Sequence, residues 1–110
     1  MSEPVVRVSV LRCKSEDFAR LRVMMVQAEA VLRPGIEALP GFLDFFAGAD
    51  EAAGAMINTS FWRTLADARQ LDHFPPMLDL GRVFTAEGAV FERPILHYGM
   101  LWRFGDLART

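Results

Sequence analysis

Four segments of the chain alternate between hydrophobic and polar residues, and each has a length that suits a β-strand. They cover residues 5–12, 42–47, 53–62 and 95–104. The first is rich in valine and the second in phenylalanine, residue types that favour extended backbone. The short connection at residues 48–51 suits a hairpin between the second and third segments. The alternation therefore predicts four strands.

A hydrophobic stripe with helical spacing follows the first strand. The stripe consists of Phe18, Leu21, Met25, Ala28 and Leu32. Ser15 and two acidic residues precede it, and acidic side chains suit the positive end of a helix dipole. We predict a helix that begins near Ser15, stops or kinks at Pro34-Gly35 and resumes briefly over residues 36–39.

A second helical stripe follows the third strand. It consists of Leu65, Ala68, Leu71 and Phe74. Pro75-Pro76 is expected to end this helix, because a proline disfavours helical backbone at the residue before it. A further short helix over residues 77–84 is weakened by Gly81.

The predicted elements run in the order strand, helix, strand, strand, helix, strand. This is the βαββαβ pattern of the ferredoxin-like fold, an α+β architecture with one four-stranded antiparallel sheet. The 110 residues match one domain of ordinary size, and no repeat or linker divides them. We therefore predict a single domain over residues 1–110.

The faces of the predicted sheet indicate that the protein pairs with a copy of itself. Two helices cover one face of a four-stranded sheet, and the other face meets water or a partner. Neither face is charged throughout, and even the more polar face carries Leu11, Met56, Trp62, Ile95 and Leu101. A bare face of this kind exceeds the apolar patches that soluble monomers expose. The prediction is a tight homodimer, a dimeric α/β barrel.

Charge and composition argue against several classes of partner. The chain has 12 basic and 14 acidic residues and a net charge of -2, so nucleic acid and anionic membranes are not expected as partners. Residues 1–4 show no basic leader and no run of about 18 apolar residues occurs, which predicts a cytoplasmic protein. The lone Cys13 cannot form an internal disulfide and is interpreted as a half-buried thiol at a strand end.

One face of each predicted strand, called here the mixed face, carries isolated polar groups among apolar ones. These groups are Arg7, Ser9, Asp44, Asn58, Ser60, His97 and Arg103. If the mixed faces line up, they form an apolar cavity with a few convergent polar groups, which is typical of small-molecule sites. The alternative is that the same side chains are solvated near strand ends or satisfy one another. The alternation leaves both interpretations open.

Four residues are candidates for chemistry, and each has a structural alternative. Asn58 needs hydrogen-bond partners within an apolar strand, which a ligand or a neighbouring strand could supply. Trp62 either stacks on a planar substrate or anchors a helix to the sheet. Arg82 binds an anionic oxygen or faces water, and His97 is an acid–base group or a structural histidine. The sequence contains no phosphate loop, catalytic triad, metal-ligand cluster or nucleotide motif, so no cofactor is predicted.

Short motifs around these residues resemble a known family. Pro40-Gly41-Phe42 follows the long first helix, and Ser60-Phe61-Trp62 precedes a helix that begins Thr64-Leu65-Ala66-Asp67. Over residues 5–104 the chain resembles the antibiotic biosynthesis monooxygenase group of the dimeric α/β-barrel superfamily. The resemblance implies a cofactor-free enzyme that oxidises polycyclic phenols to quinones, with the anion of the substrate reducing oxygen.

The resemblance also implies roles for individual residues. Asn58 and Trp62 match an asparagine that precedes a strand-end tryptophan by four positions, and Arg82 lies where it suits the arginine of that site. Ala68 stands where the group has a tyrosine. Haem-degrading relatives need an asparagine on the first strand, where this chain has Arg7, so haem degradation is not expected.

The resulting prediction is a monooxygenase-like enzyme for a small aromatic or polyketide-like molecule. Asn58 and Arg82 orient and stabilise an anionic oxygen, Trp62 stacks on the ring, and His97 acts as acid or base. The alternative is a non-catalytic dimer that binds an apolar small molecule, or a stress-related accessory domain. The missing tyrosine at Ala68 and the small number of titratable groups favour this alternative.

Overall fold

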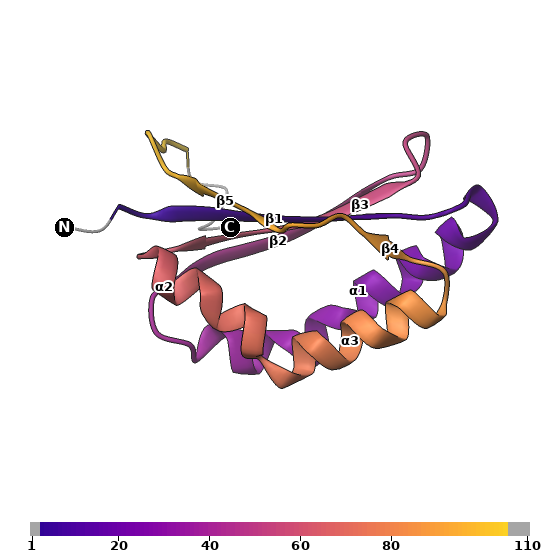
Figure 1. The fold of residues 1–110 in the computed structure, drawn as a ribbon, viewed down its shortest axis with the longest axis horizontal. Coiled ribbons are helices and arrows are strands. Elements are labelled where there is room, and N and C mark those ends of the chain that lie inside the picture. Colours follow the sequence, from indigo (N-terminus) through magenta and orange to yellow (C-terminus); the bar gives the residue numbers. More distant parts are fainter. Residues whose placement is uncertain (1–2, 106–110) are drawn as a thin grey trace.

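The computed structural model describes residues 3–105. Met1 and Ser2, which belong to the segment where we expect no leader, lie outside the described residues, as do residues 106–110. The described chain forms two layers, an antiparallel sheet and a set of helices packed against one of its faces (Figure 1). No helix among these residues is long and apolar enough to cross a membrane.

The order of the elements agrees with the predicted fold. The strands are β1 (Val5–Arg12), β2 (Phe42–Asp50), β3 (Ala55–Trp62), β4 (Val90–Phe91) and β5 (Leu96–Gly99). The helices are α1 (Ser15–Glu37), α2 (Leu65–Ala68) and α3 (Pro75–Ala86), with a 3-10 helix, η1 (Arg69–His73), between the last two. Across the sheet β2 pairs with β3 and β3 with β1, while β4 and β5 both pair with the other edge of β1. This arrangement confirms the α+β, ferredoxin-like fold.

The fourth predicted strand is shorter than expected, and a separate short strand, β4, precedes it. β4 pairs with the end of β1, whereas β5 pairs with its beginning, along the same edge. Residues 92–95 between them contain Pro94, which has no N–H to give to a ladder. The prediction of a strand over residues 95–104 is therefore right about its start but wrong about its end, because strand structure stops at Gly99, and it missed β4.

The helices cover the mixed face of the sheet. Arg7 and Ser9 of β1 and Ser60 of β3 are buried there, and Asn58 lies beside them. The opposite face, called here the open face, is turned away from the helices (Figure 1). In the two central strands it consists of Val6, Val8, Val10, Ile57, Thr59 and Phe61. The alternation sorted these residues onto two faces correctly, and the structure adds which face the helices take.

Asp44 and Arg103 were predicted on the mixed face and lie on the open face instead. The register between β2 and β3 shifts by one residue after Phe42, which leaves Leu43 as an extra residue in β2. Such a bulge reverses the faces that the following side chains occupy. Arg103 lies beyond β5, and its Nη2 is 3.0 Å from Oδ2 of Asp44.

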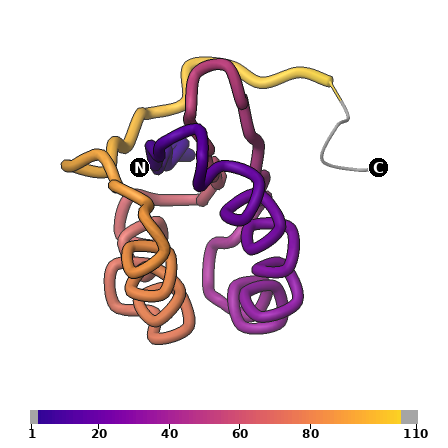
Figure 2. The backbone as a smooth tube through the Cα atoms, turned by 90° about the vertical axis from the view of Figure 1, so that its right-hand side faces the viewer, coloured from indigo at the N-terminus to yellow at the C-terminus, as the bar shows by residue number. Residues whose placement is uncertain are grey.

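The segment after β5 runs over the open face toward the far edge of the sheet (Figure 2). Arg103 reaches Asp44 of β2 and also lies over the ring of Phe61, 5.5 Å from its centroid. Leu101 and Trp102 in this segment are largely exposed, at 90% and 74%. The open face is therefore crossed by an apolar segment that is itself uncovered.

The helices differ from their predicted bounds at the prolines. α1 continues through Pro34 to Glu37 and does not stop there, because Pro34 lies on the exposed side, where the carbonyl it leaves unbonded meets water. The predicted helix over residues 65–74 is divided into α2 and η1. Pro75 occupies the first position of α3. A backbone N–H at that position has no acceptor within the helix, so a proline there costs no hydrogen bond.

Two apolar clusters attach the helices to the mixed face, one toward each end of the central strands. The first comprises Leu11, Phe18, Leu21, Met56, Phe84 and Ala89. The second comprises Val5, Ile36, Trp62, Ala68 and Leu71. Val5 and Leu11 stand near opposite ends of β1, and Met56 and Trp62 near opposite ends of β3. The polar residues in the middle of both strands consequently lie between the clusters.

The turn before β2 requires a glycine. Gly41 has a φ of 77°, and a Cβ at this position would collide with the carboxylate of Asp67. The carbonyl oxygen of Gly41 accepts a hydrogen bond from the Arg63 N–H at 2.8 Å. The Asp67 N–H in turn donates to Oγ1 of Thr64 at 3.0 Å and so caps α2. Two of the motifs that carried the family resemblance thus contact each other and fix where β2 and α2 begin.

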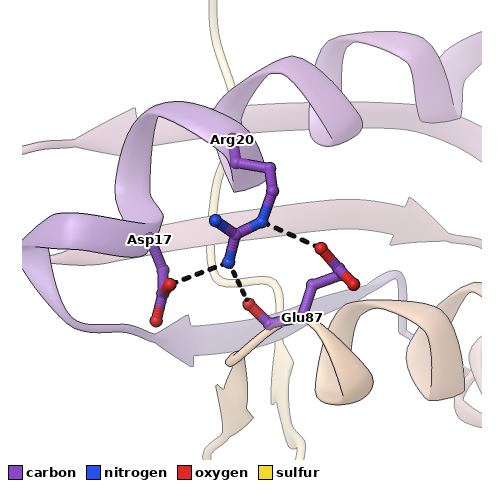
Figure 3. A network of polar contacts seen from close by, with 3 residues as sticks. All are labelled: Asp17, Arg20 and Glu87. Atoms are coloured by element: carbon purple, nitrogen blue, oxygen red, sulfur yellow. Dashed lines mark hydrogen bonds and ion pairs between the residues drawn. The ribbon is translucent and has the colours of Figure 1, made fainter.

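An arginine joins the two long helices at one end of the helix layer (Figure 3). Nη2 of Arg20 in α1 lies 2.7 Å from Oδ1 of Asp17, and its Nε lies 2.9 Å from Oε1 of Glu87, directly after α3. The same Nη2 donates to the Glu87 carbonyl oxygen at 2.7 Å. Since these groups are partly exposed, their main effect is to set the spacing of α1 and α3 and not to add much stability.

Candidate pocket between the sheet and the helices

A pocket of about 740 Å³ lies between the sheet and the two long helices. Its floor is the middle of the mixed face, and its walls come from α1, η1, α3 and the segment that joins β4 to β5. The apolar lining includes Met25, Leu32, Leu71, Met77, Leu80, Phe84, Phe91 and Ile95. A volume of this size, mostly apolar with a few polar groups, is typical of a small-molecule site.

Three polar residues form the floor of the pocket. Arg7, Ser9 and Asn58 come from β1 and β3, and Ser9 and Asn58 stand directly opposite each other in the ladder. Oδ1 of Asn58 accepts a hydrogen bond of 3.3 Å from Nη1 of Arg7. Within residues 3–105, the amide nitrogen of Asn58 donates to no side chain or backbone group. It is therefore available to a ligand.

Arg7 is the most buried charged group of the pocket, with 2% of its surface exposed. Burial lowers the pKa of its guanidinium from the ordinary value, Asp72 opposes this by raising it, and Arg93 lowers it further. An arginine nevertheless stays protonated, because its ordinary pKa lies far above neutral pH. The floor of the pocket therefore carries a positive charge.

The mouth of the pocket carries charged residues of both signs. Arg82 from α3 is one of them, but its Nη1 is 2.7 Å from Oδ1 of Asp79, and both side chains are largely exposed. Arg93 lies over the ring of Phe91, 5.3 Å from its centroid. Asp72 adds a carboxylate from η1. A ligand oxygen near Arg82 would have to compete with Asp79 and with water.

Trp62 is placed in the core and not in the pocket lining. Its side chain is fully buried in the second cluster, and it meets Phe42 edge to face with ring centroids 5.6 Å apart. Its Nε1–H donates to Oγ of Ser60 at 2.8 Å, which satisfies both buried groups. These contacts match the structural interpretation of Trp62, an anchor between sheet and helices.

His97 also lies outside the pocket lining. It stands directly opposite Arg7 in the ladder between β1 and β5, and its Nε2 is buried without a hydrogen-bond partner among the described residues. Burial lowers the pKa of His97, and the neighbouring Arg7 lowers it further. The imidazole is consequently neutral near neutral pH, so it can accept a proton but has none to spare as an acid.

The lowered pKa of His97 predicts a pH-dependent stability. Because the folded protein binds this proton less tightly than the unfolded chain, the free energy of unfolding should fall as pH drops below about 6.5. The fall should level off below the lowered pKa. Urea unfolding over a pH series would show this slope, which should be reduced in His97→Gln and retained in the control His73→Gln. An unchanged slope in His97→Gln would contradict the assignment.

The structure brings Asn58 and Arg82 into one pocket and leaves Trp62 and His97 outside its lining. Arg7 joins the pocket, although sequence reasoning placed it only among the polar groups of the mixed face. The signal for it was present: an arginine in the middle of a strand rich in valine, on the same face as Ser9. What the sequence could not supply was the burial of that arginine.

The described residues hold no group of three or more histidine, cysteine, aspartate or glutamate side chains that could bind a metal ion.

Cys13 lies just beyond β1 and is partly buried, as predicted. Burial and the nearby Asp17 raise the pKa of its thiol, which disfavours the reactive thiolate.

A second hollow of about 840 Å³ lies between α1 and β2. Its charged residues include Glu29, Arg33 and Glu37, which pair with one another at the surface of α1. None of these three carries an unsatisfied buried atom. The two buried polar atoms without a partner among residues 3–105 belong to Arg7 and His97, and neither residue lines this hollow.

Comparison with known proteins gives a consistent picture of the fold. No protein-family model matches the chain, and no curated protein matches it in sequence. Among solved structures, a provisionally named antibiotic biosynthesis monooxygenase from Deinococcus radiodurans is similar with a TM-score of 0.69 and 18% identity, over 92% of this chain and 96% of the other. One from Nitrosomonas europaea reaches 0.69 with 15% identity, over 96% and 97%.

A third similar structure is a variant of SnoaB, described as a cofactor-independent oxygenase from Streptomyces nogalater, in which an asparagine is replaced by alanine. Its TM-score is 0.67 with 13% identity, over 93% of this chain and 97% of the other. The chain has the fold of the antibiotic biosynthesis monooxygenases. At these identities the similarity establishes the fold alone. The antibiotic biosynthesis monooxygenase fold thus positions the walls of the pocket. The chemistry of the pocket depends on the residues that line it.

Proposed function

We propose that the protein is a monooxygenase-like enzyme that oxidises a small aromatic or polyketide-like molecule without metal or flavin. The observation that carries the proposal is Asn58, whose free amide nitrogen lies on the polar floor of an otherwise apolar pocket of about 740 Å³. The similarity of the fold to a cofactor-independent oxygenase supports the same assignment.

The reaction balances with molecular oxygen as the only co-reactant. A phenol and O₂ give a quinone and water, so one oxygen atom enters the ring and the other leaves with two hydrogens from the substrate. The electrons come from the substrate, which reacts as its phenolate or enolate. The protein's task is to hold the ring among apolar side chains, exclude water and stabilise the anionic oxygen with preorganised donors. Asn58 is such a donor, and Arg82 is a second one at the mouth of the pocket.

Proton transfer is assigned to His97 in this proposal. Ala68, at the position of the family's tyrosine, is fully buried in the second cluster and has no proton to exchange. The lowered pKa of His97 keeps it neutral and able to accept a proton. Because His97 lies beside Arg7 and outside the lining, the role requires a substrate that reaches the β5 side of the floor.

The proposal is tested by oxygen consumption and quinone absorbance with tricyclic phenols under air. Asn58→Leu keeps the side-chain volume but removes the donor, and should lower the rate by about 100-fold, as the loss of one oxyanion donor does. Arg82→Met should have a smaller effect because Arg82 is exposed and paired with Asp79. Arg33→Met on the outer surface of α1 is the control and should leave the rate unchanged. If oxygen consumption and ligand binding are unaffected in both Asn58→Leu and Arg82→Met, the assignment is abandoned.

A second candidate function is non-catalytic binding of an apolar small molecule. The buried Ala68 and the absence of Trp62 and His97 from the pocket lining favour it. Binding of the same tricyclic phenols without any oxygen consumption would support this function over the first.

We also propose that the protein acts as a homodimer in the cytoplasm, with the open face of the sheet between the two copies. The support is the apolar character of that face and of the exposed segment that crosses it. The pocket lies on the opposite side of the sheet.

A further inference from the structure

Among the residues that the structure describes, Arg7 is a buried cation without a counterion. Only 2% of its surface is exposed, and within residues 3–105 its guanidinium forms no ion pair with any carboxylate. Its Nη1 donates to Asn58, while its Nε is buried and has no hydrogen-bond partner. A buried charge without a partner is costly, because the lost hydration is not replaced. A folded protein keeps such a group where something else satisfies it.

The surroundings of Arg7 indicate from which side a group that satisfies its guanidinium can approach. Its neighbours on the floor are the neutral Ser9 and Asn58, and His97 beside it is neutral as well. Arg93 adds a second positive charge, and Asp72 is exposed and too distant for an ion pair. Arg7 itself lines the large apolar pocket, so its guanidinium borders that space directly. The group that satisfies Arg7 therefore enters from the pocket.

We propose that the pocket selects aromatic anions and that Arg7 is the residue that binds their charged oxygen. The oxygen, from a ring carboxylate or from a phenolate, pairs with the Arg7 guanidinium and accepts a hydrogen bond from the Asn58 amide. The ring lies among the apolar walls contributed by α1 and α3. The planar, multidentate guanidinium suits such oxyanions better than an ammonium would. This inference shares its pocket with the proposed function and deepens it by naming the charge class of the ligand.

The inference predicts opposite effects of one substitution on stability and on binding. Arg7→Met replaces the buried cation by an apolar side chain of similar length. Without ligand, the variant should melt at a higher temperature than the wild type, because it no longer buries an unpaired charge. With an aromatic anion present, the wild type should gain melting temperature and the variant should not. A purely structural arginine would give only a loss of stability.

Calorimetric titration with three probes tests the charge class. 2-Naphthoate is the carboxylate, 2-naphthol becomes a phenolate when pH is raised, and 2-naphthalenemethanol is the neutral reference. The wild type should bind naphthoate at least about 10-fold more tightly than naphthalenemethanol, and naphthol binding should tighten as naphthol ionises, because hydrogen bonds to a charged group are stronger than those to a neutral one. A response to naphthoate alone identifies a carboxylate ligand, and a response to ionised naphthol alone identifies a phenolate.

The variants decide whether Arg7 is responsible. Arg7→Met should bind the anionic and neutral probes equally, Arg7→Lys should keep part of the preference, and Arg12→Met, an exposed arginine of the same strand, should keep all of it. Equal binding of all three probes by the wild type, or a preference that survives in Arg7→Met, overturns the inference. If Arg7→Met fails to fold, the wild-type preference and Arg7→Lys still decide. Anion binding without oxygen consumption would refute the proposed reaction and leave the anion site standing.

Discussion

Replacing Trp62 by alanine is expected to lower the free energy of unfolding by about 3–5 kcal/mol, the usual range for a large aromatic residue removed from a core. Trp62 has no exposed surface and fills the second cluster between β3 and the helices. Its indole also satisfies the buried hydroxyl of Ser60. The substitution leaves both a cavity and an unpaired hydroxyl, and each adds to the loss.

Trp62→Phe separates packing from the hydrogen bond. It keeps an aromatic ring next to Phe42 but leaves Ser60 without its donor, so a smaller loss of about 1–3 kcal/mol is expected. Urea unfolding of both variants measures the two effects, and ligand titration runs beside it. If Trp62→Ala costs less than about 1 kcal/mol, the packing role is wrong. If Trp62→Phe unfolds like the wild type but no longer binds an aromatic ligand, the stacking role predicted from the sequence is correct after all.

The position of Trp62 shows how far spacing along a strand can be interpreted. Asn58 and Trp62 are four residues apart, so alternation places them on the same face, and the structure agrees. Four residues of strand also span about 13 Å, more than the width of one aromatic ring. One residue consequently lies on the floor of the pocket and the other in the cluster at the end of the strand. A shared face is a local property, whereas a shared pocket depends on where the helices pack.

The elements that the sequence predicted well are those governed by local rules. β1 and β3 alternate over eight residues each, and their sorting into two faces needed no knowledge of their neighbours. The bulge at Leu43 could not be seen in this way, because it is defined by the pairing of β2 with β3. The same holds for β4 and β5, whose division depends on how residues 92–95 meet the edge of β1.

Arg7 illustrates the limit for the site itself. The sequence placed it among polar groups that either converge or are solvated, and both outcomes fit the same pattern of residues. Which of these two outcomes applies to Arg7 depends on how far its guanidinium lies from the carboxylates of the fold. Among residues 3–105, Asp79 of α3 pairs with Arg82, and no carboxylate forms an ion pair with Arg7. The sequence thus shows an arginine on this face, but its burial and its lack of an ion-pair partner among residues 3–105 are visible only in three dimensions.

Lysine at Val8 is expected to separate the proposed homodimer into single chains. Val8 faces Thr59 across β1 and β3, in the middle of the open face and away from the pocket. In a dimer built on this face, each copy would bury an unpaired ammonium group, which costs several kcal/mol. Since about 1.4 kcal/mol is a tenfold change in affinity, pairing should weaken by about 100-fold or more. Sedimentation should therefore show two chains together for the wild type and one for Val8→Lys at the same micromolar concentration.

The matched control is Val23→Lys, the same change on the exposed side of α1, where the valine is 53% exposed. It should sediment like the wild type. The free energy of unfolding of Val8→Lys should be lower than that of the wild type, because the single chain lacks the dimer contacts that stabilise the folded state. A wild type that sediments as one chain, or a Val8→Lys variant that remains paired, would remove the open face as the dimer contact. In the first case the exposed apolar segment over the sheet, with Leu101 and Trp102, would have to be covered by something other than a second copy.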